Sequence, residues 1–166
     1  MTGKEIQVSA GLTTEGLLGR RYGARFIDSI VLILLICATQ VLVFRRVLLV
    51  GGEGWPTNAI AGVLAFVLTL GYFTVQESSA AQATLGKRLM TLRVYDAQGG
   101  RLSLAQAAGR NLVKDGPFFV LGPLGPLWLV AHLVVMHRSP VYQAIHDRVA
   151  HTWVAAPEEV TQLRLS

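Results

Sequence analysis

Charged residues are scarce in this chain of 166 residues: they make up 15% of it, whereas a soluble domain usually carries about 25%. Apolar residues account for 52%, and the mean hydropathy is +0.47. Three long stretches contain no Asp, Glu, Lys or Arg at all: residues 29–44, 58–76 and 116–137. This composition excludes an intrinsically disordered chain, which needs low hydrophobicity and high net charge. It also argues against a soluble enzyme.

The groups that most enzymes use are few as well. Cys37 is the single cysteine, which excludes a disulfide scaffold. We find no Ser-His-Asp arrangement, glycine-rich phosphate loop or CxxC pair, and the four histidines lack the thiolate partners of a typical metal site. We therefore expect no enzyme activity, cofactor or metal. The net charge of +5 is divided among the flanks of the apolar stretches, so we also expect no nucleic-acid partner.

The first two charge-free stretches predict transmembrane helices at about residues 29–50 and 57–76, because a span needs about 20 apolar residues. The first is preceded by three arginines, Arg20, Arg21 and Arg25. Positive residues beside the first span usually stay inside the cell, so we expect a cytoplasmic N-terminus. Residues 77–115 hold six Lys and Arg against three Asp and Glu, which predicts a cytoplasmic insert.

The third stretch, residues 116–137, is long enough to cross once, but three Gly-Pro pairs interrupt it. Because proline breaks a helix, we expect two half-helices, 118–121 and 127–136, joined by a turn. A predicted strand at 91–95 would also need a partner at 151–155, on the same side of the membrane. We therefore favour a re-entrant element and a cytoplasmic C-terminus. A plain third span is the alternative.

The insert shows signs of regular structure. Turn-forming residues 96–100 follow the first predicted strand, and Ser103 with Gln106 forms a capping-box pattern that starts a helix ending near residue 115. Arg110 and Lys114 share one face of this helix, which suits an anionic leaflet; packing within its own domain is the alternative. We therefore predict an α-helical polytopic membrane protein. Its parts are two transmembrane helices, a broken or re-entrant third hydrophobic element, and a cytoplasmic β-hairpin with an amphipathic helix.

Four motifs occur along the chain. They are Arg21-x6-Asp28, ATLGKRL with LRV at 83–94, GRLS with RN at 100–111, and AIHDRVAHT at 144–152. Together they resemble the RDD family, over about residues 19–155 and between polar tails at 1–18 and 156–166. The resemblance implies a multi-pass protein of the prokaryotic cytoplasmic (plasma) membrane. It supports an architecture more strongly than an activity, because the activities of the family are largely unassigned. Ligand transport is proposed for the family, and sodium–proton exchange for some members.

The family's name residues map onto Arg21, Asp28 and Asp147, and these are the candidate site. A carboxylate at the entrance of a span is costly unless it is paired, and Arg21 and Arg25 both lie on the helical face of Asp28. One hypothesis is an ion relay, in which a proton or sodium ion displaces the arginine from two aspartates. The other is a structural lock between the first helix and the C-terminal motif. The supporting candidates are Arg25, Gly86, Lys87, Arg88, His146, Arg148 and Thr152.

Two functions from different classes fit these observations. Transport of an ion or small solute would need a homo-oligomer, because three membrane elements enclose a pathway poorly. An accessory or assembly subunit of a larger membrane complex is the alternative, and it explains the small size of the chain. Binding of lipid headgroups by Lys87, Arg88 and the basic helix is a further reading. In each case the lipid bilayer is a partner. His146 is in addition a candidate pH sensor, because histidine titrates near neutrality.

Overall fold

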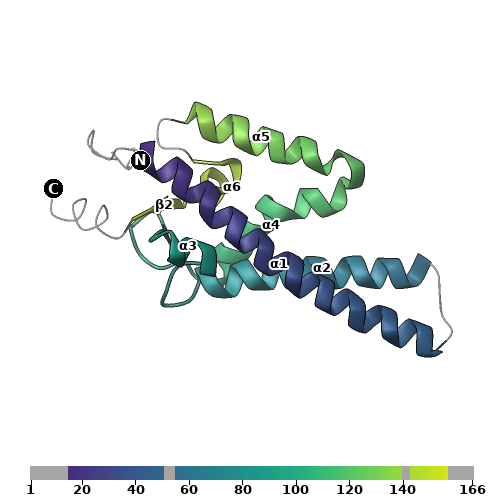
Figure 1. Ribbon diagram of the computed structural model, residues 1–166. Coiled ribbons are helices and arrows are strands. Elements are labelled where there is room, and N and C mark those ends of the chain that lie inside the picture. The colour runs from purple at the N-terminus through teal and green to yellow at the C-terminus, as the bar shows by residue number, and fades with distance from the viewer. Residues whose placement is uncertain (1–14, 51–54, 140–142, 157–166) are drawn as a thin grey trace.

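The computed structural model describes residues 15–50, 55–139 and 143–156, so most of the two predicted polar tails lies outside it. The described chain is mainly helical, with one small sheet (Figure 1). Two helices are long and apolar enough to cross a membrane, over Leu17–Arg45 and Ala59–Glu77. These match the first two predicted spans, although the first helix begins earlier than the predicted span at residue 29.

Helix α1 (Glu15–Val50) has 36 residues, and α2 (Trp55–Glu77) has 23. At 1.5 Å per residue α1 is about 54 Å long, well beyond the hydrocarbon thickness of about 30 Å. The helix is therefore longer than one crossing needs, and its first four turns carry Arg20, Arg21 and Arg25. We call residues 29–50 and 55–76 the apolar arm. Figure 1 shows its two helices running side by side away from the rest of the molecule.

The shorter helices and the two strands form what we call the cap, residues 77–115 and 143–156. It contains α3 (Leu85–Leu89), β1 (Arg93–Tyr95), the first part of α4, α6 (Ile145–Val149) and β2 (Trp153–Ala155). Strands β1 and β2 pair antiparallel, with Val94 opposite Val154. The expected pairing of 91–95 with 151–155 is confirmed. The predicted β-hairpin is wrong, because the two strands are joined through α4 and α5 and not by a turn.

A small apolar core holds the cap against the start of α1. Leu17 and Ala24 of α1 pack with Leu92, Val94 and other buried residues of the cap. At the edge of the sheet the Tyr95 and Trp153 rings lie 5.4 Å apart, and the Trp153 Nε1 donates to the Asp96 carbonyl at 2.7 Å. Burial of these apolar side chains is the main force that closes such a cluster. The N-terminal turns of α1 are thus part of the cap's core.

Helix α4 (Leu104–Val120) starts at the predicted capping box, in which Ser103 and Gln106 bond reciprocally. The chain then reverses through η1 (Gly122–Leu124) into α5 (Gly125–Arg138). The predicted break is confirmed at Gly122, whose φ of +53° suits glycine. The separate half-helix at 118–121 is wrong, because α4 continues through Pro117 and loses only one backbone donor there.

The reversal brings the chain back to the cap, where β2 joins β1. A Cβ on Gly125 would lie 2.8 Å from the Phe118 carbonyl oxygen, so the close turn requires glycine. The third hydrophobic stretch is therefore a helical hairpin of α4 and α5, whose two ends both lie at the cap end of the molecule (Figure 1).

Candidate functional site

Arg110 of α4 is the centre of a buried ionic cluster, and only 1% of it is exposed. Its Nη1 donates to Glu77 Oε2 at 2.6 Å, and its Nη2 donates to Asp147 Oδ1 at 2.6 Å. Its Nε also lies 3.1 Å from the Thr152 hydroxyl. One guanidinium therefore connects the end of α2, helix α6 and the residue before β2. Charge-assisted bonds of this kind are the strong ones.

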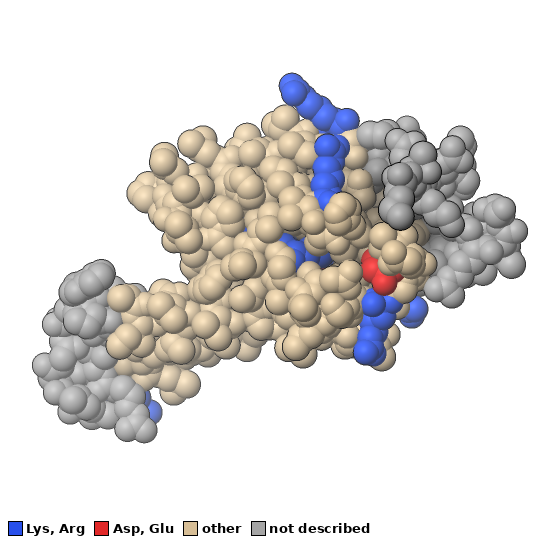
Figure 2. Space-filling view, turned by 180° about the vertical axis from the view of Figure 1, so that it is seen from behind, with Lys and Arg blue, Asp and Glu red and all other residues tan. Residues whose placement is uncertain are grey.

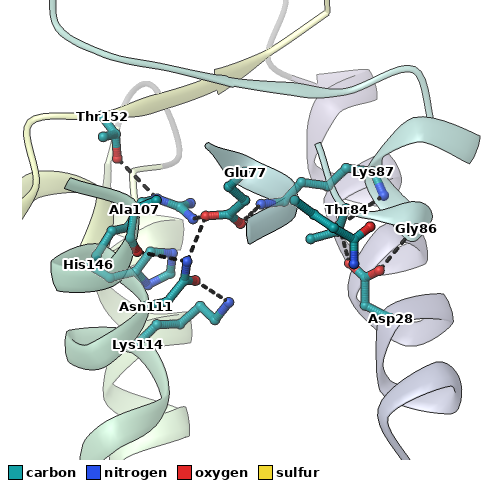
Figure 3. Close-up of polar contacts among 12 residues, drawn as sticks. Asp28, Glu77, Thr84, Gly86, Lys87, Ala107, Asn111, Lys114, His146 and Thr152 are labelled. Carbon is teal, nitrogen blue, oxygen red and sulfur yellow. Dashed lines mark hydrogen bonds and ion pairs between the residues drawn. The ribbon is translucent and has the colours of Figure 1, made fainter. Parts of the chain in front are cut away.

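Glu77, the last residue of α2, is fully buried. Besides Arg110 it accepts from the Asn111 amide at 3.0 Å and from the Lys87 ammonium. Figure 3 shows Glu77 lying between Asn111 on one side and Lys87 on the other. A buried carboxylate is stable only when paired and hydrogen-bonded. Glu77 therefore ties α2 to both α3 and α4.

Asp147 of α6 is also fully buried, and its Oδ2 lies 2.5 Å from the Arg21 Nη2. The Ala144 amide donates to the same oxygen at 3.2 Å. Burial alone would raise the pKa of Asp147, but the neighbouring positive charges, including Arg110 and Arg21, hold its pKa well below the usual range. The carboxylate therefore stays charged near neutral pH. Arg21 and Asp147, two of the three name residues, are in contact.

Asp28 is placed differently from our expectation. Its carboxylate accepts from the Tyr72 hydroxyl at 2.8 Å, the Thr84 hydroxyl at 2.5 Å and the Gly86 amide at 2.8 Å. The expected arrangement of two aspartates around one arginine is wrong, because Arg21 pairs with Asp147 and the donors to Asp28 are neutral. The reason is local. Thr84 caps α3, and the Gly86 N–H in the first turn of that helix donates to the carboxylate.

Gly86 allows this close approach. A Cβ added to it would lie 2.1 Å from the Ala24 carbonyl oxygen and 2.9 Å from Asp28 Cγ. Real Cβ atoms do not come so near backbone, so only glycine lets α3 pack directly on α1. The TLGK sequence thus gives a cap, a donor and a contact point within four residues.

A second layer of charge lies beside the first. Arg25 pairs with Asp115 at 2.9 Å, so it does not serve Asp28 as expected. The Lys114 ammonium lies 2.8 Å from Asn111 Oδ1 and 3.1 Å from the centre of the Phe73 ring. Burial lowers the pKa of Lys114 to about 7, and its neighbour Asp115 opposes this shift. Lys114 is therefore close to losing its charge at neutral pH.

These contacts correct the expected amphipathic helix on a leaflet. Arg110 and Lys114 point into the protein, because Glu77, Asp147 and Asp115 compensate them there. The alternative, a helix packed within its own domain, is what the structure shows. Of the supporting candidates, Gly86, Lys87, His146 and Thr152 lie in or beside the cluster, whereas Arg88 and Arg148 are exposed. Lipid-headgroup binding by Lys87 loses its basis, since Lys87 pairs with Glu77.

Sequence reasoning missed Glu77, Arg110 and Asn111 as site residues. A signal existed for the first: a lone glutamate directly after 19 uncharged residues needs a partner. Arg110 and Asn111 lie within one of the four motifs but resemble any polar helix face. The residues that the structure describes contain no group of three or more His, Cys, Asp or Glu arranged for a metal ion.

Comparisons with known proteins add one result. No curated protein and no solved structure matches the chain. The model of the RDD family matches residues 16–151, a range that begins just before Arg21 and ends just after Asp147. It includes all four motifs almost entirely, together with every described residue of the ionic cluster except Thr152. The chain therefore belongs to the RDD family of membrane proteins.

Proposed function

We propose that this protein is an accessory or assembly subunit of a larger membrane complex, in which the ionic cluster clamps the cap onto the membrane helices. The observation that carries the proposal is the saturation of the carboxylates. Asp28, Glu77 and Asp147 each accept hydrogen bonds from three groups of the protein itself. A carboxylate that carries an ion needs a free position for it, whereas a structural lock needs none.

The surface of the apolar arm supports the same proposal. Within the most apolar windows of the two candidate spans, only 11% and 17% of the residues are buried. In Figure 2 the arm projects as a surface almost free of charged side chains, while the blue cations gather toward the cap. Most of the arm is therefore available to lipid or to helices of another subunit. In membranes such contacts rely on close packing, for which small residues such as Gly62 and Gly71 are suited.

For the topology, we propose a cytoplasmic cap and N-terminus in the cytoplasmic membrane of a prokaryote. The exposed arginines of the cap, among them Arg88, Arg93 and Arg101, support this orientation. The hairpin of α4 and α5 would enter the membrane from the cap side and return. Its exposed Phe118, Val120 and Leu127 fit contact with lipid.

Transport through a homo-oligomer is the second candidate, and one observation favours it. Asp28 lies at the membrane entrance with only neutral donors around its carboxylate. Against it, residues 29–44 and 58–76 contain no ionisable Asp, Glu, Lys or Arg, so a proton or sodium ion would find no carboxylate along the arm. A pathway would have to come from contacts between copies.

The deciding experiment is extraction of the tagged protein in mild detergent, followed by native mass spectrometry. The proposal expects a stoichiometric unrelated membrane protein in the complex. In the same cells, Asp147→Asn should lower the abundance of the protein, and Arg148→Gln, an exposed neighbour, should not. A homo-oligomer alone, combined with sodium or proton flux in proteoliposomes that Asp28→Asn abolishes at normal abundance, would favour transport instead.

A further inference from the structure

Two histidine rings lie stacked where α5 meets α6. The centroids of His132 and His146 are 4.9 Å apart, and their planes are inclined by only 18°. Both residues are buried. The lone pairs of an imidazole lie in its ring plane, so two nearly parallel rings cannot converge on one metal ion or bond to each other. The pair therefore makes an aromatic contact between two helices, and not a ligand set.

The ring nitrogens of this pair are poorly satisfied. Among the described residues, both nitrogens of His132 and the Nδ1 of His146 have no hydrogen-bond partner. The Trp128 carbonyl lies near His132, but the two do not meet the geometry of a hydrogen bond. Buried polar atoms are usually bonded, so such exceptions call for an explanation. Each neutral ring can accept one proton, on the nitrogen that does not already carry one.

We propose that the stacked His132–His146 pair is a proton-binding site that controls the docking of α5 on α6. This regulation goes beyond the proposed function and does not depend on any partner protein. Two neutral rings stack favourably in a buried place, whereas a charged ring there loses its water. Protonation should therefore favour a state in which the two helices separate and the rings reach solvent.

Charges of both signs face the pair. Asp147 of α6 faces His132 together with Asp115 and Lys114 of α4, and Arg110 and Lys114 of α4 face His146. On α6 itself Asp147 Oδ1 lies 3.3 Å from the His146 Nε2. However, the Asp147 carboxylate already accepts from Arg110, from the Ala144 amide and from Arg21 of α1. It has little capacity left to compensate a second cation.

The direction of the pH dependence follows from this burial. Burial lowers the pKa of His146 well below its usual value, although the negative charge of Asp147 opposes this shift. In the separated state an exposed histidine has a pKa of about 6.5. Above that pH both states are neutral and docking is unaffected. Below it the separated state gains a proton, and its population rises up to tenfold per pH unit for each such histidine.

The test measures the distance between α5 and α6 by double electron–electron resonance, on the full chain in lipid nanodiscs. Spin labels go on the exposed Val134→Cys and Val149→Cys, in a Cys37→Ala background. We expect one short distance at pH 8 and a growing second population below about pH 6.5. A control pair on the arm, Leu42→Cys with Val63→Cys, should give the same distance at every pH.

Three variants assign the response. His146→Phe keeps a ring but cannot titrate, and it should leave a smaller second population that only His132 still drives. His137→Gln removes an exposed histidine of α5, and Lys114→Gln removes the nearby lysine; both should keep the response. An unchanged distance in the parent protein from pH 8 to pH 5 would overturn the proposal. So would a response in His146→Phe as large as that of the parent protein, or one that disappears in Lys114→Gln. If His146→Phe does not fold, His132→Phe takes its place and the parent titration still decides.

Discussion

The cap and the apolar arm of this protein are held together by different interactions. The cap is specified by directed contacts: four carboxylates, those of Asp28, Glu77, Asp115 and Asp147, are buried there or at its border with the arm, each opposite named donors or cations. Among the arm residues whose side chains the structure describes, the hydrogen bonds lie mostly within a helix, such as Thr39 to the Leu35 carbonyl at 2.8 Å. Gln40 bonds across the arm to the Ala61 carbonyl at 3.0 Å. The stability of the cap therefore depends on particular side chains at particular positions, whereas the stability of the arm depends on the hydrophobicity of its residues.

Arg110→Met should have the largest effect on stability. It leaves Glu77 and Asp147 buried without their shared cation, a change that typically costs about 3–5 kcal/mol. We expect little folded protein, which reversible unfolding in mixed micelles would measure. Arg101→Met is the matched control on the exposed surface of the cap and should stay within about 0.5 kcal/mol. Equal stability of the two variants would remove the distinction between buried and exposed arginines.

Leu34→Lys tests the arm. Leu34 is exposed near the middle of the charge-free part of α1, and a lysine at the centre of a span costs about 2.5–3.5 kcal/mol on insertion scales. The inserted fraction in a translocation assay should fall, whereas Leu34→Met should insert normally. Normal insertion of Leu34→Lys would mean that this face of the arm does not meet lipid.

Gly86→Ala tests the contact between cap and arm. The added Cβ would meet the Ala24 backbone at 2.1 Å, and overpacking of this kind costs about 1–3 kcal/mol. In Gly109→Ala, within α4, nothing lies within 4 Å of the new Cβ. This control should gain about 0.5–1 kcal/mol, because alanine is the better helix former. Thermal unfolding of both variants gives opposite signs if α3 packs on α1 as described.

Thr84→Val should give the smallest loss. It removes the hydroxyl that donates to Asp28 at 2.5 Å and also caps α3, for a cost of about 1–2 kcal/mol. Thr39→Val makes the same change in the arm, where the hydroxyl bonds only its own helix, and should stay within about 0.5 kcal/mol. Indistinguishable unfolding midpoints would contradict the contrast between the two regions.

Much of the fold could be predicted from the sequence, because local signals set it. The uncharged stretches predicted both spans, Ser103 with Gln106 predicted the start of α4, and the Gly-Pro pairs predicted the reversal near Gly122. The pairing of β1 with β2 followed from their shared need for a partner. The length of α1 was missed, because its first turns are stabilised by the cap's core and not by lipid.

The site was harder to predict because its contacts are long-range. Arg110 and Arg101 look alike in the sequence, and only the folded chain brings Glu77, 33 positions away, to one of them. Asp28 was assigned an arginine because Arg21 and Arg25 share its helical face, but α3 supplies neutral donors from 56 and 58 positions away. Spacing along a helix shows which pairs are within reach, and it does not show which partner the tertiary structure supplies.

The most direct test of the clamp is a double-mutant cycle on Arg110 and Glu77, measured as unfolding free energy for the parent, Arg110→Met, Glu77→Gln and the combined variant. The clamp predicts strong coupling between the two substitutions. The loss of unfolding free energy in the combined variant should be smaller, by about 1.5–3 kcal/mol, than the sum of the two single losses. The reason is that Arg110→Met leaves the Glu77 carboxylate unpaired, and Glu77→Gln removes that charge. Losses that add within about 0.5 kcal/mol would contradict it. In that case the cap would be held by its apolar core alone.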